Sequence, residues 1–565
     1  MWERRVAPAW DRPGTRRGTR RRTLSLPGPG SIRRVTDETR VTTTDRPVAT
    51  TKDRSVMLAT AWRTIRGLDR DLLPVAEAFR AQGHTLHLVG GSVRDALLGR
   101  LSHDLDFTTD ARPEQVVEIL TPLAETVWDT GIAYGTVSAM IRGTVVEITT
   151  YRADTYDGDS RNPEVTYGDT LEGDLVRRDF RCNAMALELS PVGEHVFHDP
   201  LGGLDDLEAG ILDTPAAPET SFHDDPLRML RACRFVAQLG FDVSARVREA
   251  MTAMSGEIAR ITVERVQAEL NTLLLGVAPG QGLDLMVDTG LGDVVLPELP
   301  ALRLTQDEHH QHKDVYLHSL QVLSNAVELE AERWADGIPL GDGEVREKTD
   351  DDSLQLRWAA LLHDCGKPET REFTEEGGVT FHHHEVVGAR MVRRRLKALK
   401  FPKRMTENIG TLVFLHMRFH GYSEGLWSDA AVRRYVADAG DLLPHLHLLV
   451  RADCTTRNVN KAAWLRRSYD QLEERIAELR EREDLAAVRP DLDGDEIMEV
   501  LGLRPGPGVG VARTFLLNLR LDRGPLGREA AVAELRRWWD DGGSAEVAAA
   551  EQSGRKRRRG EGDRG

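Results

Sequence analysis

Two glycines and two aspartates in the stretch Leu88–Phe107 have the chemistry of a nucleotide-binding site. An apolar run ends at Gly90 and Gly91, a helix-like segment follows, and Asp104 and Asp106 come next. Paired glycines between a strand and a helix let backbone N–H groups approach an anion. Carboxylates two residues apart on a strand share one face, where oxygen ligands suit Mg²⁺. The stretch predicts a phosphate cradle beside a magnesium site, as nucleotidyl transfer requires; a turn followed by a solvated acidic loop is the alternative.

A basic helix is predicted over residues 225–239. Asp225 stands at the expected N-cap, Pro226 at the first helical position and Gly240 at the exit. At about 100° per residue, three arginines fall on one exposed arc and apolar residues on the other. The spacing alone favours a capping aspartate and a solvated face over a binding role. The arginines are Arg228, Arg231 and Arg234.

The glycine–aspartate stretch resembles the head of the polymerase-β-like nucleotidyltransferases, specifically the bacterial tRNA nucleotidyltransferase and poly(A) polymerase family. The family motif Gly-Gly-x-Val-Arg-Asp is present here from Gly90 onward. The resemblance implies that Gly91 and Arg94 contact nucleotide phosphates. It also implies that Asp104 and Asp106 are the catalytic residues and hold Mg²⁺.

A second motif with the same resemblance is Arg177–Ala184, which is similar to the family's Arg-Arg-Asp-Phe-Thr-x-Asn-Ala. It implies that Arg178 positions phosphates. Arg181 stands where the family has threonine, so no role transfers to Arg181.

The predicted basic helix matches a third family motif, Glu-Asp-x-x-Arg, with Asp224 in place of the glutamate. The resemblance implies that Asp225 and Arg228 form a template for the base edge of CTP or ATP. The carboxylate accepts from the exocyclic amine and the guanidinium donates to ring acceptors. Arg231 and Arg234 then continue onto the triphosphate.

The segment Leu361–Pro368 resembles the HD phosphohydrolase signature. In that family a His-His-Asp-Asp set binds one divalent ion, and two more histidines are candidates for a second. The first set here is His318, His363, Asp364 and Asp453; the candidates for the second ion are His384 and His416.

The composition limits the class of protein. A chain of 565 residues with 40% hydrophobic content is expected to form two to four globular domains. No apolar run approaches the roughly 20 residues that cross a bilayer, and four scattered cysteines suit a reduced, cytoplasmic protein. The net charge of −16 excludes an extensive nucleic-acid coat, but an RNA enzyme needs only a local basic track.

The expected fold is an α/β head, with a small mixed sheet and helices, followed by an all-α neck, HD domain and tail. A helix is expected over 61–82 and a hairpin around Arg142-Gly143. Glu147 in that hairpin is either a third acid of the metal site or a solvent-facing residue. The expected domains are a disordered Arg-rich extension (1–58), the head (59–205), the neck (206–300), the HD domain (301–475), a helical tail with a tRNA contact (476–545) and a disordered basic end (546–565).

Family resemblance and local chemistry together predict template-independent addition of CCA to the 3′ end of tRNA, from CTP and ATP with Mg²⁺. The HD domain implies a second divalent metal and an additional phosphohydrolase activity. A poly(A) polymerase or an enzyme adding only part of CCA shares these motifs and stays an alternative. Asp104 and Asp106 disfavour a non-catalytic RNA-binding protein. The order of domains disfavours a signalling synthetase–hydrolase, in which the HD domain comes first. Oligomeric state and HD substrate stay open.

Overall fold

The computed structural model describes residues 54–100, 104–152, 167–168, 170–190, 195–303, 314–340, 343–375, 378–419, 427–456, 458–483 and 489–562. The expected extension therefore lies outside the described residues up to residue 53. From Arg54 the chain is helical, and Met57 is 1% exposed in the core, so the expectation of disorder to residue 58 is wrong for 54–58. Within the described residues, no helix has the length and apolarity to cross a bilayer.

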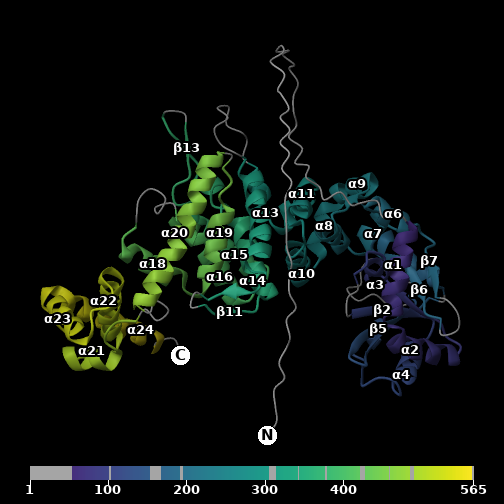
Figure 1. Ribbon diagram of the computed structural model, residues 1–565, viewed down its shortest axis with the longest axis horizontal. Helices are drawn as coiled ribbons and strands as arrows, with labels where there is room; N and C mark the ends of the chain where they lie inside the picture. The colour runs from purple at the N-terminus through teal and green to yellow at the C-terminus, as the bar shows by residue number, and fades with distance from the viewer. Residues whose placement is uncertain are drawn as a thin grey trace, which may run out of the picture. The chain divides into compact units, whose positions relative to one another are not determined.

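The head is built on a mixed sheet of seven strands in the order β3-β4-β5-β2-β1-β6-β7. Figure 1 shows four of them, β2, β5, β6 and β7, in the N-terminal part of the chain. β2 and β5 are parallel, and the other neighbouring pairs are antiparallel. The predicted hairpin is confirmed: β4 and β5 pair across Arg142 and Gly143, both of which have positive φ. The strands are β1 (Leu86–Val89), β2 (Asp104–Thr109), β3 (Thr126–Trp128), β4 (Thr136–Ile141), β5 (Thr144–Thr150), β6 (Ala186–Glu188) and β7 (Val196–His198).

The two faces of the sheet differ in chemistry. One face carries Leu88, Phe107 and Ile148, all at most 2% exposed, and packs in one core with the helices that precede and follow β1. Because side chains alternate along a strand, Asp106 and Glu147 point from the opposite face. The head helices are α1 (Arg54–Arg66), α2 (Asp69–Ala81), α3 (Gly91–Leu97), α4 (Pro113–Leu120) and α5 (Leu171–Val176).

The helix expected over 61–82 is two helices, α1 and α2, separated at Gly67 and Leu68. Arg63 and Arg66 occupy the last turn of α1, and Asp69 and Asp71 the first turn of α2. Cations at a helix C-terminus and anions at an N-terminus are each favourable, so the charges support the break.

Helices make up most of the remainder. The neck contains α6 (Gly203–Ala209), α7 (Pro218–Asp224), α8 (Leu227–Leu239), α9 (Ala245–Met254), α10 (Val263–Leu274), α11 (Pro279–Asp288) and α12 (Leu291–Val295). The next region contains α13 (Val315–Arg333), α14 (Asp350–Leu362), α15 (His384–Ala398), α16 (Lys403–Leu415), α18 (Asp429–Ala439), α19 (Leu443–Ala452) and α20 (Val459–Glu483). In this region α13, α14 and α19 pack against one another (Figure 1). Between the helices lie the short two-stranded pairs β8–β9 (Ile211–Leu212, Asp242–Val243), β10–β11 (Ile338–Pro339, Val345–Arg346) and β12–β13 (Glu372–Phe373, Val379–Thr380).

The tail has its own small apolar cluster, which includes Leu492, Ile497 and Leu516. Its helices are α21 (Gly494–Leu501), α22 (Pro507–Arg523), α23 (Arg528–Trp538) and α24 (Ser544–Gly562). The structure assigns residues 546–562 to α24, where a disordered end was expected from the sequence.

Candidate active site and metal centre

A left-handed glycine turn joins β1 to α3. Gly90 has φ 70° and ψ −138°, a conformation essentially restricted to glycine, and α3 begins at Gly91. A Cβ atom placed on Gly90 would lie 3.1 Å from Nη1 of Arg178 and 3.8 Å from Oδ2 of Asp106. The structure therefore brings together three features that are far apart in the sequence: the glycine turn, one predicted catalytic carboxylate and one predicted phosphate-binding arginine.

Acidic residues line the two parallel strands beside this turn. Asp104 pairs with Val145 and Asp106 with Glu147, so Glu147 lies on the strand next to Asp106 and on the same face. Asp106 and Glu147 are both exposed, and Ser138 Oγ lies 3.4 Å from Glu147 Oε1. The side chain of Asp104 lies outside the description. Exposed carboxylate oxygens in register are the donor type that fits Mg²⁺.

The two arginines nearest the turn have internal partners. Arg178 Nη2 donates to Asp174 Oδ2 at 3.0 Å. Arg94 is 9% exposed, and it donates to Asn183 Oδ1 at 2.8 Å and to the neighbouring Asp95. Carboxylate and amide oxygens of the protein thus hold both guanidinium groups beside the turn.

The basic helix is α8, and its boundaries differ from the prediction by one residue. Pro226 is the N-cap, while Gly240 ends the helix with φ 69°, as predicted. Asp225 still accepts from the Leu227 N–H at 3.1 Å through Oδ1, and its Oδ2 lies 2.8 Å from Arg265 Nη2. The predicted apolar arc is buried: Met229, Leu230, Cys233, Val236 and Ala237.

The predicted exposed stripe of arginines is half-buried instead, because each arginine holds a partner. Arg228 donates to Ser221 Oγ at 2.8 Å and to the Arg177 carbonyl at 2.5 Å. Arg231 pairs with Asp179 at 2.6 Å, and Arg234 pairs with Glu269 at 2.9 Å. The predicted template residues Asp225 and Arg228 thus hold different partners.

Asp179 anchors this arrangement. It is buried, and it accepts from the Phe180 N–H, from Asn183 Nδ2 and from Arg231. Burial alone would raise the pKa of Asp179, but the Arg231 charge and these hydrogen bonds lower it to about 2. Asp179 is therefore an anion that positions Arg231.

Arg181, the residue that departs from the family motif, has a structural role here. Its guanidinium lies 2.8 Å from Asp206 and 2.7 Å from Asp213. These ion pairs connect the segment after α5 to α6 and to the chain that follows β8.

A second site gathers six ionisable residues from separate helices and turns. One group contains His318, His363 and Asp453, and the other contains Asp364, His384 and His416. Within each group the ligand atoms lie within 4.8 Å of one another. All of the HD residues predicted from the sequence are thus brought together.

Asp364 connects the two groups because its two oxygens face different histidines. Oδ2 lies 3.3 Å from His363 Nε2 and 3.5 Å from His318 Nε2. Oδ1 lies 3.3 Å from His384 Nε2 and 3.9 Å from His416 Nε2. This geometry fits a carboxylate that bridges two cations.

The histidine rings are held in an orientation that suits metal binding. Nδ1 of His363, His384 and His416 lies 2.9, 2.9 and 2.6 Å from the carbonyl oxygens of Ala360, Phe381 and Val413. A carbonyl only accepts, so Nδ1 carries a proton and Nε2 is the ring atom directed at the cluster. Such an outer hydrogen bond is typical of metal-ligating histidines, so the residues fit a divalent metal centre.

Without metal, the cluster holds its charge unevenly. Burial lowers the pKa of His416 to about 3. For His363 the lowering by burial is outweighed by the adjacent Asp364 carboxylate, and the pKa rises to about 9. Lys367 Nζ also lies 2.6 Å from Asp364 Oδ2. A cation that binds between His363 and Asp364 displaces a proton, as ligand deprotonation requires.

Three family models match successive parts of the chain. The model described as "Poly A polymerase head domain" matches residues 86–213, "Probable RNA and SrmB- binding site of polymerase A" matches 240–302, and "HD domain" matches 315–458. An A-adding tRNA nucleotidyltransferase of Deinococcus radiodurans is 32% identical over 462 residues, which are 80% of this chain and 95% of that protein. The chain belongs to the tRNA nucleotidyltransferase and poly(A) polymerase family.

One curated relative aligns over a shorter stretch, and one solved structure over most of the chain. A CCA-adding enzyme of Leuconostoc mesenteroides is 40% identical over 231 residues, 41% of this chain. The chain thus spans about half (55%) of that relative's length. The crystal structure of a Bacillus stearothermophilus CCA-adding enzyme in complex with CTP covers 83% of this chain and 97% of its own, with TM-score 0.56 and 24% identity. At that identity the likeness shows the shared fold.

Sequence reasoning did not predict that carboxylates hold three arginines of the head and neck. Asp174 lies on α5, and Arg178 follows it by four residues, just after the end of that helix. This spacing is a signal for an ion pair. Asp179 and Glu269 reach Arg231 and Arg234 across the fold. No local pattern marks those two contacts.

Proposed function

We propose that this protein adds nucleotides to the 3′ end of tRNA and completes the CCA sequence from CTP and ATP. The observation that carries the proposal is the position of the Gly90 turn, with Asp106 and Arg178 beside it. Such a turn binds phosphate through backbone N–H groups, and the carboxylate is the donor for the metal that phosphoryl transfer needs. The names of the relatives support nucleotide addition to tRNA, and that of the CCA-adding relative supports the use of CTP.

In the proposed reaction, each residue has a defined task. Asp104 and Asp106 hold Mg²⁺, with Glu147 as a third acid on the same face. When bound, the metal lowers the pKa of the attacking 3′-hydroxyl and neutralises the triphosphate. Gly91 and Arg94 at the turn, together with Arg178, orient the phosphates.

Base selection is proposed for Asp225 and Arg228, and triphosphate contact for Arg231 and Arg234. For a base to bind, Asp225 must release Arg265, and Arg228 must release the Arg177 carbonyl. Asp225 keeps Oδ1 on the Leu227 N–H in this exchange, so one oxygen stays fixed while the other meets the exocyclic amine.

Addition of the terminal A alone is the second candidate. The relative from Deinococcus radiodurans aligns over 95% of its own length, and its name limits it to A addition. Both activities use the same metal and phosphate chemistry, so they differ in whether CTP is a substrate.

The experiment uses tRNA transcripts ending at the discriminator base, at C and at CC, each incubated with CTP alone, ATP alone or both. A CCA-adding enzyme extends all three and needs CTP for the first two. An A-adding enzyme extends only the CC transcript, and only with ATP. Extension of none of them, with Mg²⁺ present and the protein folded, contradicts the proposal.

For the second site we propose two divalent ions bridged by Asp364, one held by His318, His363 and Asp453 and the other by His384 and His416. Asp364→Asn removes the bridging charge and is expected to lower the bound metal, counted by mass spectrometry, by up to two ions per chain. Equal metal content in wild type and variant contradicts the bridged centre.

The proposed tRNA substrate implies a cytoplasmic protein.

A further inference from the structure

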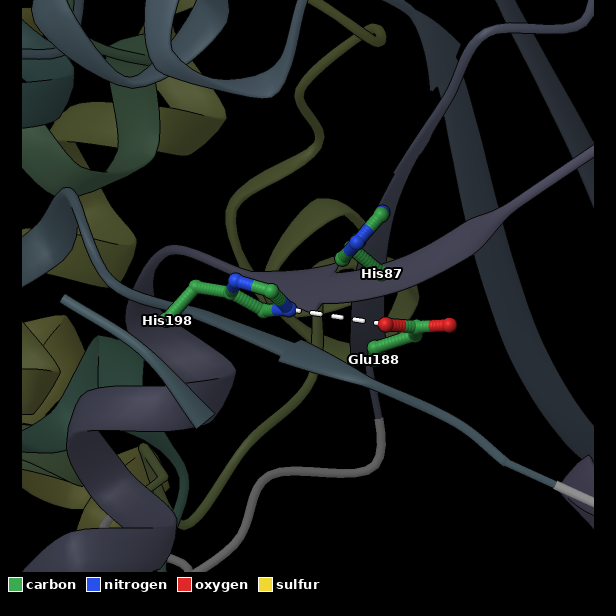
Figure 2. Close-up of side chains that lie close together, drawn as sticks. All are labelled: His87, Glu188 and His198. Carbon is green, nitrogen blue, oxygen red and sulfur yellow. Dashed lines mark ion pairs between the residues drawn. The ribbon is translucent and has the colours of Figure 1, made fainter. Parts of the chain in front are cut away.

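Three side chains on the head sheet form a cluster outside both sites described above. They are His87 on β1, Glu188 on β6 and His198 on β7, and Figure 2 shows the His198 ring directed at the Glu188 carboxylate with His87 beside them. One ligand atom from each lies within 4.8 Å of the others. His198 Nε2 lies 3.5 Å from Glu188 Oε2.

The strand pairing preorganises this cluster. His87 is directly opposite Glu188, and Ala186 is opposite His198, so all three side chains project from one face of rigid neighbouring strands. It is the same face that carries Asp106, because His87 is also opposite Thr108. The register of the paired strands thus fixes the positions of the three side chains, and no loop is involved.

A hydrogen-bond chain fixes the state of the His87 ring. Asp110 Oδ1 lies 3.3 Å from Thr85 Oγ1, which lies 3.3 Å from the Tyr151 hydroxyl, which lies 3.0 Å from His87 Nδ1. A carboxylate only accepts, so Thr85 donates to Asp110, Tyr151 donates to Thr85, and His87 Nδ1–H donates to Tyr151. His87 Nε2 therefore keeps its lone pair.

His198 and Glu188 have few other polar contacts in the described part of the chain. His198 Nε2 is a buried atom without a hydrogen bond there. The ion pair found for Glu188 among the described residues is the one with His198. A buried polar atom without a partner is costly, and a cation between these groups would give His198 Nε2 a partner.

From this geometry we infer that His87, Glu188 and His198 bind a divalent transition ion such as Zn²⁺. Imidazole donors favour Zn²⁺ over Mg²⁺. In a tetrahedral site with Zn–N distances of 2.0–2.1 Å the donors are about 3.3 Å apart, close to the 3.5 Å between His198 and Glu188. Three protein ligands leave the fourth position to water. The ion would connect the edge strand β7 to the central strand β1.

The test counts zinc in the full-length protein after chelation, reloading with ZnCl₂ and gel filtration. Because the cluster around Asp364 contributes equally to every variant, the difference from wild type isolates the head site. His198→Asn and Glu188→Gln are each expected to lose one equivalent. The matched control is His195→Asn, which removes a histidine three residues from His198 that pairs with Asp69 instead. It is expected to keep full zinc content.

Tyr151→Phe tests the hydrogen-bond chain. Loss of such an outer partner is expected to weaken zinc affinity about 10- to 100-fold without changing the stoichiometry. Circular dichroism of each variant checks folding. Where a histidine variant misfolds, the zinc content of Glu188→Gln, which keeps the shape of the side chain, tests the site. Wild-type zinc content in His198→Asn or Glu188→Gln, or an equal loss in the His195→Asn control, overturns the inference.

Discussion

Substitution of Gly90 tests whether the left-handed turn positions the active site. In Gly90→Ala the new residue must adopt φ 70° and ψ −138°, which is strained for any residue with a Cβ atom. Such a conformation costs about 1–3 kcal/mol. The new Cβ would also lie 3.1 Å from Arg178 Nη1, so the guanidinium must shift by a few tenths of an ångström. We expect loss of stability in the head together with loss of nucleotide addition.

Gly91→Ala is the matched control. Gly91 is the first residue of α3, and its added Cβ would lie 3.5 Å from Arg94 Nη2, an ordinary contact. Alanine is favoured over glycine inside a helix by about 0.5–1 kcal/mol. Gly91→Ala is therefore expected to be as stable as wild type or more so. Its nucleotide addition still falls if phosphate approaches this backbone, because the methyl group obstructs the approach.

The assay is calorimetry of the full-length chain, with hydrogen exchange of the β1 and β2 amides to assign the transition. A loss of 1–3 kcal/mol corresponds to about 5- to 150-fold faster exchange from globally opened amides. It lowers the melting temperature of a domain of this size by about 2–12 °C. Wild-type exchange and melting in Gly90→Ala would refute the reasoning, because the turn would then tolerate a side chain.

Four further outcomes are expected. Asp106→Asn should reduce addition of both nucleotides at least tenfold while tRNA still binds in a gel-shift assay; retained activity would remove Asp106 from the metal site. Asp225→Asn should keep its melting temperature, since an asparagine Oδ1 can also accept from the Leu227 N–H. It should nevertheless lose discrimination against UTP and GTP in kcat/KM; unchanged selectivity would show that Asp225 does not choose the base. The pKa of Asp179 is lowered to about 2, so its ionised form contributes about 2–3 kcal/mol to the free energy of unfolding above pH 5, and this contribution is lost as the pH falls toward 2. The difference in melting temperature between wild type and Asp179→Asn should therefore narrow between pH 5 and 3. A constant difference would contradict this. Deletion of residues 1–53 should leave the melting temperature and nucleotide addition unchanged. Met57→Ala, at a residue that is 1% exposed, should instead lower the free energy of unfolding by about 2–5 kcal/mol. A destabilised truncation would make the deleted segment part of the fold.

Short sequence patterns predicted the turns and helix ends that depend only on neighbouring residues. The hairpin at Arg142-Gly143 and the end of α8 at Gly240 follow from glycines that adopt positive φ. The start of α1 had a local signal as well. Met57, Ala61 and Ile65 are spaced four residues apart and are all buried, but the basic and polar residues around them obscured the pattern.

Contacts between distant segments were not predictable in the same way. Asp364 was expected to bind a metal, but which histidines each of its oxygens faces depends on how several helices pack. His87 and Glu188 are opposite one another because β1 pairs with β6, a pairing about a hundred residues apart in the chain. Strand alternation indicates which face such a residue occupies, but not which partner it meets.

The ion pairs of the head and neck have a consequence for the proposed nucleotide addition. Arg178, Arg231 and Arg234 are already paired with Asp174, Asp179 and Glu269. A triphosphate bound as proposed would have to replace these internal anions, so each contact would gain only the difference between two similar ion pairs. Pyrophosphate would leave by the reverse exchange, with the carboxylates returning to the guanidinium groups. In the proposed reaction, binding would thereby stay weak enough for pyrophosphate to depart after each addition.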